Sequence, residues 1–190
     1  MQLNEVIEAL TNWTQENICN STQLLEPSES AMSSEYNLVT PKAFALYVPP
    51  KDQLPPDVET QVPSVCLQLE EGQDDMRENT RRLKIRFAFS TYRPGSYEEV
   101  EGEEGQTEVK FTRNADGWKD IWLWVSKSIN KIQTEMYIEG VKVDRTTPIK
   151  YGHFTIDDAL ALAYPMWYAW AEVTVICGIS SKANSYNTLL

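Results

Sequence analysis

The stretch PMWYAWAEVTVIC (165–177) decides the fold, because alternation along it gives a β-strand with two non-polar faces. One face receives mainly small or branched side chains: Trp167, Ala169, Ala171, Val173 and Val175. The other face receives Met166, Tyr168, Trp170, Glu172, Thr174 and Ile176. A half-exposed antiparallel strand is normally polar on its outer side. This segment therefore predicts a packed core on one side and a second cover on the other.

Two further segments alternate in the same way. SVCLQLEE (64–71) places Val65, Leu67 and Leu69 on one face, and LKIRFAFSTY (83–92) repeats the pattern more cleanly. The polar segment GQDDMRENTRR (72–82) lies between them. The pattern predicts two antiparallel strands joined by a polar loop.

Helical spacing of apolar residues appears twice. Residues 3–18 carry one apolar stripe: Leu3, Val6, Ile7, Leu10, Trp13 and Ile18. Residues 114–136 carry a second stripe: Trp118, Ile121, Trp122, Val125, Ile129, Ile132 and Met136. Trp124 lies off this second stripe, and Asp116 is the expected N-cap. The sequence thus predicts two amphipathic helices.

The remaining segments are expected to be less regular. Residues 21–63 hold seven of the ten prolines and predict an extended arm, with an edge strand at 43–48. Residues 96–108 contain six glutamates and no Lys or Arg, so an acidic, solvated loop is expected within 93–113. TEVKFT (107–112) suits a short strand, 141–154 an irregular strand and 155–163 a helical turn or loop. A polar tail (178–190) follows.

The predicted order is helix, two strands, helix, two strands. This order favours a single domain over residues 1–190 of the α+β class. Its expected form is a two-layer sandwich, with a mostly antiparallel sheet and both helices on one face, plus the proline-rich arm.

Composition limits the classes of function. The net charge is −11, with 17 Lys and Arg against 28 Asp and Glu, so specific nucleic-acid binding is not expected. Apolar runs are too short for a membrane span, and a signal peptide is not expected. The cysteines, Cys19, Cys66 and Cys177, match neither a disulfide framework nor a zinc pattern, which favours assembly in a reducing cytoplasm.

Catalytic patterns are weak, and neither an enzyme nor a cofactor or metal site is predicted. His153 is the only histidine, and a Cys–His nucleophile would need one of the mid-strand thiols beside it. Asp157 and Asp158 suit a helix cap as well as an acid/base pair with His153. The acidic residues Glu70, Glu71, Asp74 and Asp75 lack the spacing of a known cation loop. Phosphate-binding glycine motifs are absent from the sequence.

The tryptophans divide into two groups. Trp13, Trp118, Trp122 and Trp167 fit the core, whereas Trp124 and Trp170 lie off the inward stripes. Aromatic side chains of the second kind are typical of protein–protein interfaces. Because the outer face of 165–177 also needs a cover, we expect a homo-oligomer, in the form of a ring with head-to-tail contacts.

Three segments carry a resemblance to a known family: NADGWKDIWLWVSKSINKI (114–132), TTPIKYGHF (146–154) and AYPMWYAWAEVTV (163–175). Their Gly-Trp helix start, Pro and Gly in the next strand, and Tyr-Pro-x-Trp entry to the last strand resemble tail terminators (tail completion proteins) of tailed bacteriophages and prophages. The resemblance covers roughly residues 60–177.

The resemblance implies a structural virion protein of the tail or neck, assembled in the host bacterial cytoplasm as a hexameric ring. Such a ring ends growth of the tail tube and joins it to the head. Implied partners are further copies of the chain, the tail tube protein and the head–tail connector proteins. Contacts are expected at Met166, Tyr168, Trp170 and Trp124, with Phe44 and Tyr47 of the arm adding a strand to a neighbour.

Three alternatives remain open. One is another subunit of the same machine, such as a head-closure ring, a sheath-associated subunit or a baseplate piece, which the long arm favours. The second is an acidic DNA mimic, although the acidic residues cluster in loops. The third is an enzyme using His153 and nearby carboxylates.

Overall fold

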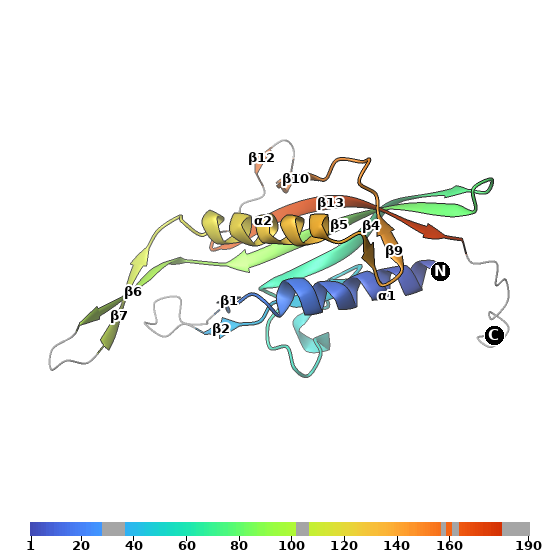
Figure 1. The fold of residues 1–190 in the computed structure, drawn as a ribbon. Coiled ribbons are helices and arrows are strands. Elements are labelled where there is room, and N and C mark those ends of the chain that lie inside the picture. The colour runs from blue at the N-terminus through green and yellow to red at the C-terminus, as the bar shows by residue number, and fades with distance from the viewer. Residues whose placement is uncertain (28–36, 102–106, 157–158, 161–163, 180–190) are drawn as a thin grey trace.

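The chain has a mixed α+β fold with mostly antiparallel strands, as the sequence predicts. A computed structural model describes residues 1–27, 37–101, 107–156, 159–160 and 164–179. Helices α1 (Leu3–Thr14) and α2 (Trp118–Thr134) lie on the viewer's side of a curled sheet (Figure 1). Within the described residues that sheet has seven strands, and three two-stranded sheets accompany it.

Strand β13 (Met166–Gly178) lies at the centre of the main sheet. It pairs along its whole length with β5 (Thr80–Tyr92). Its other edge pairs with β10 (Lys150–His153) and β9 (Val141–Val143). A strand with neighbours on both sides has its backbone N–H and C=O groups largely paired within the sheet, so β13 is an interior strand and not an exposed edge.

The sheet continues outward on both sides of this centre. Beyond β5 lie β4 (Ser64–Asp75), which is antiparallel to β5, and β3 (Lys42–Ala45), which is parallel to β4. Beyond β9 lies β8 (Tyr137–Ile138), joined to β9 through Gly140, whose φ of 83° suits a residue without a side chain. All pairings other than β3–β4 are antiparallel.

One face of the sheet and both helices share a single hydrophobic core. Alternate residues of β5 and β13 enter it, and Ala171 pairs with Phe87 while Val173 pairs with Ile85. Helix α1 contributes an unbroken stripe, and the chain continues in a π-turn (Gln15–Cys19). The stripe predicted for residues 3–18 is confirmed for Val6, Ile7, Leu10, Trp13 and Ile18, whereas Leu3 is exposed.

The stripe predicted for helix α2 is confirmed for Ile121, Val125 and Ile132, and Trp122 and Ile129 pack partly buried against the core, but other positions differ. The buried residues of α2 are Ile121, Trp124, Val125, Ser128 and Ile132. The expectation that Trp124 lies off the core is wrong, and so is the placement of Trp118 and Met136 in it, since both are exposed. Ser128 enters the core because its hydroxyl donates to the Trp124 carbonyl oxygen at 2.8 Å, which satisfies its polar group. Because Ser128 is polar but faces the core, the apolar residues alone indicate a buried face of the helix that differs in part from the observed one.

The start of α2 also differs from the prediction. Gly117, and not Asp116, is the N-cap, and no side chain caps the helix. Asp116 forms an ion pair with Lys119 at 3.0 Å. A Cβ at Gly117 would overlap the indole of Trp167, so the glycine is required by close packing between the helix start and β13.

The segment predicted as a polar loop at 72–82 is largely strand. β4 and β5 extend through it as a long hairpin, with the turn at Met76–Asn79. Cross-strand partners along the extension carry opposite charges, Glu71 with Lys84 and Asp74 with Arg81. Such pairs stabilise strands that have no core to cover.

The acidic loop predicted within 93–113 is likewise a hairpin. Strands β6 (Gly95–Glu101) and β7 (Thr107–Arg113) pair along their length, and this hairpin extends away from the helices and the main sheet (Figure 1). Tyr97 and Phe111 are cross-strand partners whose ring centroids lie 5.0 Å apart. The aromatic pair explains why a glutamate-rich segment forms strands.

The proline-rich segment 21–63 contributes to the sheet. Its predicted edge strand is present as β3, but it ends at Ala45 rather than residue 48. Leu46 has a φ of 66°, and Tyr47 N–H donates to the Ala45 carbonyl oxygen, so a γ-turn ends the strand. Strands β1 (Leu24–Leu25) and β2 (Leu38–Val39) pair with each other, and a 3-10 turn occupies Lys51–Gln53.

Two expectations near the C-terminus concern residues that are only partly described. The irregular strand predicted at 141–154 is divided into β9 and β10. Within 155–163, where a helical turn or loop is expected, β11 (Thr155–Ile156) and β12 (Ala159–Leu160) pair instead. The predicted polar tail begins at Gly178, the last residue of β13, and residues 180–190 lie outside the described chain.

Candidate protein-binding face

The face of the sheet opposite the helix-side core is the candidate functional surface. The strand register places Trp170 beside Ala88, Tyr168 beside Ser90 and Glu172 beside Arg86 on this face. On the next strand, Cys66 and Gln68 are the partners of Ala88 and Arg86. The face therefore mixes aromatic, small and charged side chains, whereas the helix-side face is apolar.

Trp170 has contacts within the subunit. Its indole N–H donates to the His153 carbonyl oxygen at 2.9 Å, and its ring lies against Gly152 of β10. The guanidinium of Arg86 lies over the ring, 5.3 Å from its centroid. Arg86 also pairs with Glu70 at 3.0 Å. Trp170 is therefore partly covered by its own chain.

A groove of about 620 Å³ opens beside these residues. Its walls are mainly apolar and include the γ-turn that follows β3, the outer positions of β4 and β5, and the residues after β10. The residues that line it include Leu46, Tyr47, Val48, Cys66, Ala88, Phe154 and Tyr168. Leu46 and Tyr47 are 54% and 64% exposed, so the rim presents large apolar side chains to solvent.

The floor of the groove is neutral. Ser64 and Ser90 hydrogen-bond each other across β4 and β5 at 2.9 Å. Burial raises the pKa of the Cys66 thiol to about 11, so this thiol is protonated at neutral pH. Burial also raises the pKa of Cys19 to about 12 and that of Cys177 above its usual value. The groove is suited to contact with apolar groups rather than to nucleophilic chemistry by Cys66.

The predicted contact residues fall into two sets. Tyr168 lines the groove, Met166 and Trp170 are partly exposed on nearby parts of β13, and Tyr47 lies on the rim. Trp124 and Phe44 are 1% and 6% exposed, so their prediction as surface contacts is wrong. Trp124 packs edge-on against Phe89, with 5.0 Å between ring centroids. Phe44 is buried because its strand, β3, pairs with β4 at the edge of the main sheet and does not lie on a free arm.

Sequence reasoning missed Phe154 and Leu46 as groove residues. Phe154 directly follows β10, and the alternation that would predict this strand from sequence is interrupted by Pro148. The run FALYV (44–48) before Pro49-Pro50 signals an apolar segment. Only the γ-turn at Leu46 decides which of its side chains face solvent.

A second cluster fixes the acidic hairpin to the body of the protein. The Arg93 guanidinium pairs with Asp120 of α2 at 2.5 Å and donates to the Gly95 carbonyl oxygen at 3.0 Å. The Trp167 indole N–H donates to the Arg93 carbonyl oxygen at 3.1 Å. Tyr164 donates its hydroxyl proton to the Pro94 carbonyl oxygen. These bonds join the start of β6, the start of α2 and the start of β13.

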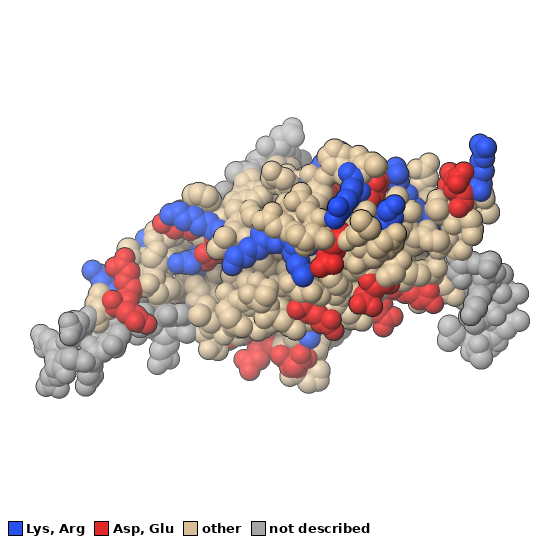
Figure 2. All heavy atoms as spheres, viewed as in Figure 1, with Lys and Arg blue, Asp and Glu red and all other residues tan. Residues whose placement is uncertain are grey.

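Charge is unevenly distributed over the helices. Helix α1 carries Glu5 and Glu8 with no Lys or Arg, whereas α2 carries Lys119, Lys127 and Lys131 with one acidic residue, Asp120. Figure 2 shows basic side chains gathered over the α2 side of this view and acidic ones over the α1 side. The two flanks of the helical layer therefore have opposite electrostatic character.

Candidate metal and acid/base groups are not assembled in the described part of the chain. Among described residues, no cluster of three His, Cys, Asp or Glu side chains is placed to hold a metal ion. Glu70, Glu71 and Asp74 instead pair with the basic residues of β5. The His153 ring packs edge-on against Trp122, with 4.9 Å between centroids, and Asp157 and Asp158 lie outside the described residues.

The chain matches no model of a known protein family and no curated protein. Each described helix is too short or too polar for a membrane crossing. The open sheet face and its groove are thus the main structural observations that bear on function.

Proposed function

We propose that this protein is a structural subunit that self-associates into a ring and acts as a tail terminator of a tailed bacteriophage or prophage. In this role the ring, a hexamer in the family that the sequence resembles, closes the end of the tail tube and joins it to the head connector. Recognition of neighbouring proteins is then its whole activity, and no catalytic step is required.

The groove on the open sheet face is the observation that carries the proposal. In a two-layer sandwich both helices cover one face, so the opposite face needs a partner wherever it is apolar. Here the exposed rim of Leu46 and Tyr47 stands beside Tyr168. Contiguous exposed apolar surface of this kind marks interaction sites on soluble proteins. A neighbouring copy is the occupant that we propose.

The charge distribution supports contacts between successive copies. In a closed ring each subunit offers two different surfaces, one to each neighbour. The acidic α1 flank and the basic α2 flank are complementary and lie on one subunit (Figure 2). The hairpin β6–β7 extends from the body, where it is placed to reach a neighbour (Figure 1). Electrostatic complementarity of this type fixes the orientation of subunits more than it adds affinity.

Mass in solution tests self-association. Light scattering across a concentration series is expected to show an oligomer that dissociates on dilution. Tyr168→Glu and Tyr47→Glu place a charge in the groove and are expected to yield monomers. Tyr137→Glu is the matched control, because Tyr137 is 57% exposed on the opposite edge strand, β8. The ring is ruled out if the chain is a monomer at every concentration in solution and is not found as an oligomer in any assembled particle.

A tube-length assay tests the terminator role separately. Tail tube protein is polymerised with and without the purified chain, and tube lengths are measured by electron microscopy. A terminator limits the length and binds at tube ends. Binding to connectors, sheath or baseplate without control of tube length identifies another structural subunit of the same machine. The long segment 21–63, which includes the strand Lys42–Ala45, favours that alternative because it adds surface for contacts with other subunits.

A further inference from the structure

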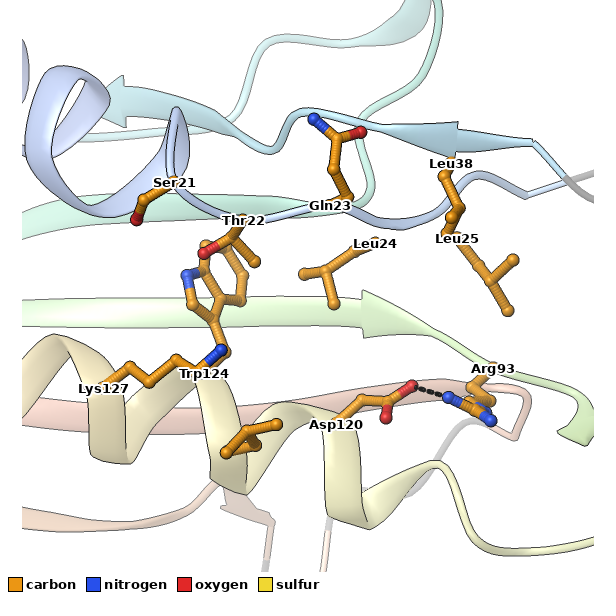
Figure 3. A pocket seen from close by; sticks show the side chains of 11 residues that line it. Ser21, Thr22, Gln23, Leu24, Leu25, Leu38, Arg93, Asp120, Trp124 and Lys127 are labelled. Carbon is orange, nitrogen blue, oxygen red and sulfur yellow. Dashed lines mark hydrogen bonds and ion pairs between the residues drawn. The ribbon is translucent and has the colours of Figure 1, made fainter.

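A separate crevice lies between α2 and the segment that links α1 to β1. It has a volume of about 200 Å³ and lies on the helix side of the sheet, away from the groove. Figure 3 shows Thr22 and Leu24 on one wall and Trp124, Lys127 and Asp120 on the other. The walls combine hydrogen-bond donors with leucine side chains.

The indole N–H of Trp124 is the feature that indicates a ligand. The side chain is 1% exposed, and its Nε1 atom is buried without a hydrogen-bond partner in the described structure. It lies at the end of the crevice where Ser21 and Thr22 are found (Figure 3). Both hydroxyls already donate to the Ile18 carbonyl oxygen. A buried donor left unpaired destabilises the folded chain, so an acceptor at this position is favoured.

The charges around the crevice favour an anionic acceptor. The Lys127 ammonium has no ion-pair or hydrogen-bond partner within the described residues. Arg93 is paired with Asp120 at 2.5 Å, so their charges cancel and the crevice keeps the one positive charge of Lys127. An acceptor that carries a negative charge would satisfy the indole and the ammonium together, and charge-assisted bonds are the stronger ones.

The leucines restrict the rest of the ligand. Leu24 is 9% exposed at the back of the crevice, whereas Leu38 and Leu123 are 51% and 57% exposed at its mouth. Exposed leucines beside a donor-lined crevice provide apolar area for a short hydrocarbon group.

We propose that this crevice binds a carboxylate joined to a small apolar group, with the Trp124 indole N–H and the Lys127 ammonium as its donors. The carboxylate belongs either to a free short-chain acid or to an acidic side chain next to an apolar residue in a peptide. The inference stands independently of self-association and of the terminator role.

Nuclear magnetic resonance of the tryptophan indole N–H groups tests the site in the full chain. The probes are isovalerate, its neutral isostere isovaleramide, and the peptide acetyl-Leu-Glu-amide, whose only carboxylate is the side chain. We expect a saturable shift of the Trp124 indole signal with a Kd in the millimolar range for isovalerate or the peptide. Isovaleramide is expected to bind at least about tenfold more weakly, because it lacks the charge.

Variants separate the proposal from non-specific binding. Lys127→Gln is expected to weaken carboxylate binding about tenfold and to leave the fold intact, since the side chain is exposed. Lys119→Gln is the matched control on α2, outside the crevice, and is expected to bind as the parent does. Trp124→Phe assigns the indole signal and removes the donor.

The outcomes are distinct. Tighter binding of isovalerate than of the peptide identifies a free acid as the source, and the reverse order identifies a peptide. The absence of a saturable shift with either carboxylate means that the indole donates only to water, which overturns the proposal. Equal binding of isovaleramide, or equal binding by Lys127→Gln, overturns the choice of a carboxylate.

Discussion

The indole of Trp167 lies directly against Gly117, where the Cβ of any other residue would overlap it. The contact joins the first turn of α2 to the first residues of β13, and the indole N–H also holds the Arg93 carbonyl oxygen. One side chain thus fixes the helix start, the end of β5 and the central strand relative to one another. The Gly-Trp and Tyr-Pro-x-Trp elements of the resemblance include both partners of this contact.

Gly117→Ala is expected to destabilise the protein by about 1–3 kcal/mol, because the added methyl group displaces a packed indole. Urea unfolding followed by circular dichroism measures the change. Gly178→Ala is the matched control, since a Cβ at that position meets no atom within 4 Å, and it is expected to leave stability nearly unchanged. Equal stability of both variants would show that Trp167 repacks freely.

The Arg93–Asp120 pair is expected to hold the base of the β6–β7 hairpin. Arg93→Gln removes both the ion pair with α2 and the charged donor to Gly95, which are both partly buried. We expect a loss of about 1–2 kcal/mol and faster hydrogen exchange at the amides of β6 and β7. Hydrogen-exchange mass spectrometry resolves the hairpin from the body.

The control for that experiment is Arg113→Gln, which removes a cation 5.1 Å from the centroid of the Tyr164 ring and its hydrogen bond to the Tyr164 hydroxyl oxygen, but leaves the Asp120 pair intact. A smaller change in hairpin exchange is expected for it. If Arg93→Gln accelerates exchange in β4 and β5 as much as in β6 and β7, the pair stabilises the whole domain instead of the hairpin.

Sequence periodicity was sufficient for the elements that border the core. Helix α1 and strands β4, β5 and β13 follow from alternation or helical spacing, because their burial repeats with the period of the backbone. Of the hairpin β6–β7, the short strand predicted at 107–112 is confirmed as β7, whereas β6 was expected to be part of an acidic loop. The stabilising partners of the hairpin, such as Tyr97 and Phe111, are distant in sequence, and the glutamates between them obscure the alternation.

The candidate protein-binding face was predictable only in outline. Alternation predicts that Tyr168 lies on the outer face of β13. The position of Tyr47 depends on the γ-turn at Leu46, and a leucine gives no sequence signal for such a turn. Trp124 was misplaced because Ser128 occupies an inward position of α2. Ser128 can face the core because its hydroxyl donates to a carbonyl oxygen of the preceding helical turn, and hydrophobic periodicity does not predict such a hydrogen bond.

Asp144 is expected to make stability depend on pH in the acid range. Hydrogen bonds from Thr146, together with Thr147 and the Arg82 charge, lower the pKa of its carboxyl to about 2 in the folded chain. These interactions exist only in the folded chain, where the side chain is 3% exposed, and the ordinary pKa of the carboxyl returns when they are lost on unfolding. The contribution, about 2 kcal/mol, is therefore complete above pH about 4 and is lost as the pH falls toward 2.

Urea unfolding at successive pH values measures this dependence. Asp144→Asn is expected to be less stable than the parent near neutral pH and to lose less stability between pH about 4 and 2, because its amide does not titrate. Arg82→Gln removes only the smallest of the contributions to the shift, so it should keep most of the dependence. Parallel curves for the parent and Asp144→Asn would exclude this carboxylate as the source.

The three cysteines are expected to react slowly in the native protein. Burial raises the pKa of Cys19 to about 12 and that of Cys66 to about 11, so thiolate is scarce at pH 8. Alkylation by iodoacetamide is expected to be at least about tenfold slower than in denaturant for all three thiols, as read by mass spectrometry. Cys66 also lines the groove, so self-association through that face should slow its reaction further as protein concentration rises, while Cys19 serves as the internal control. A rate at Cys66 that is independent of concentration, in a sample shown to be oligomeric, would place the contact between subunits elsewhere on the molecule.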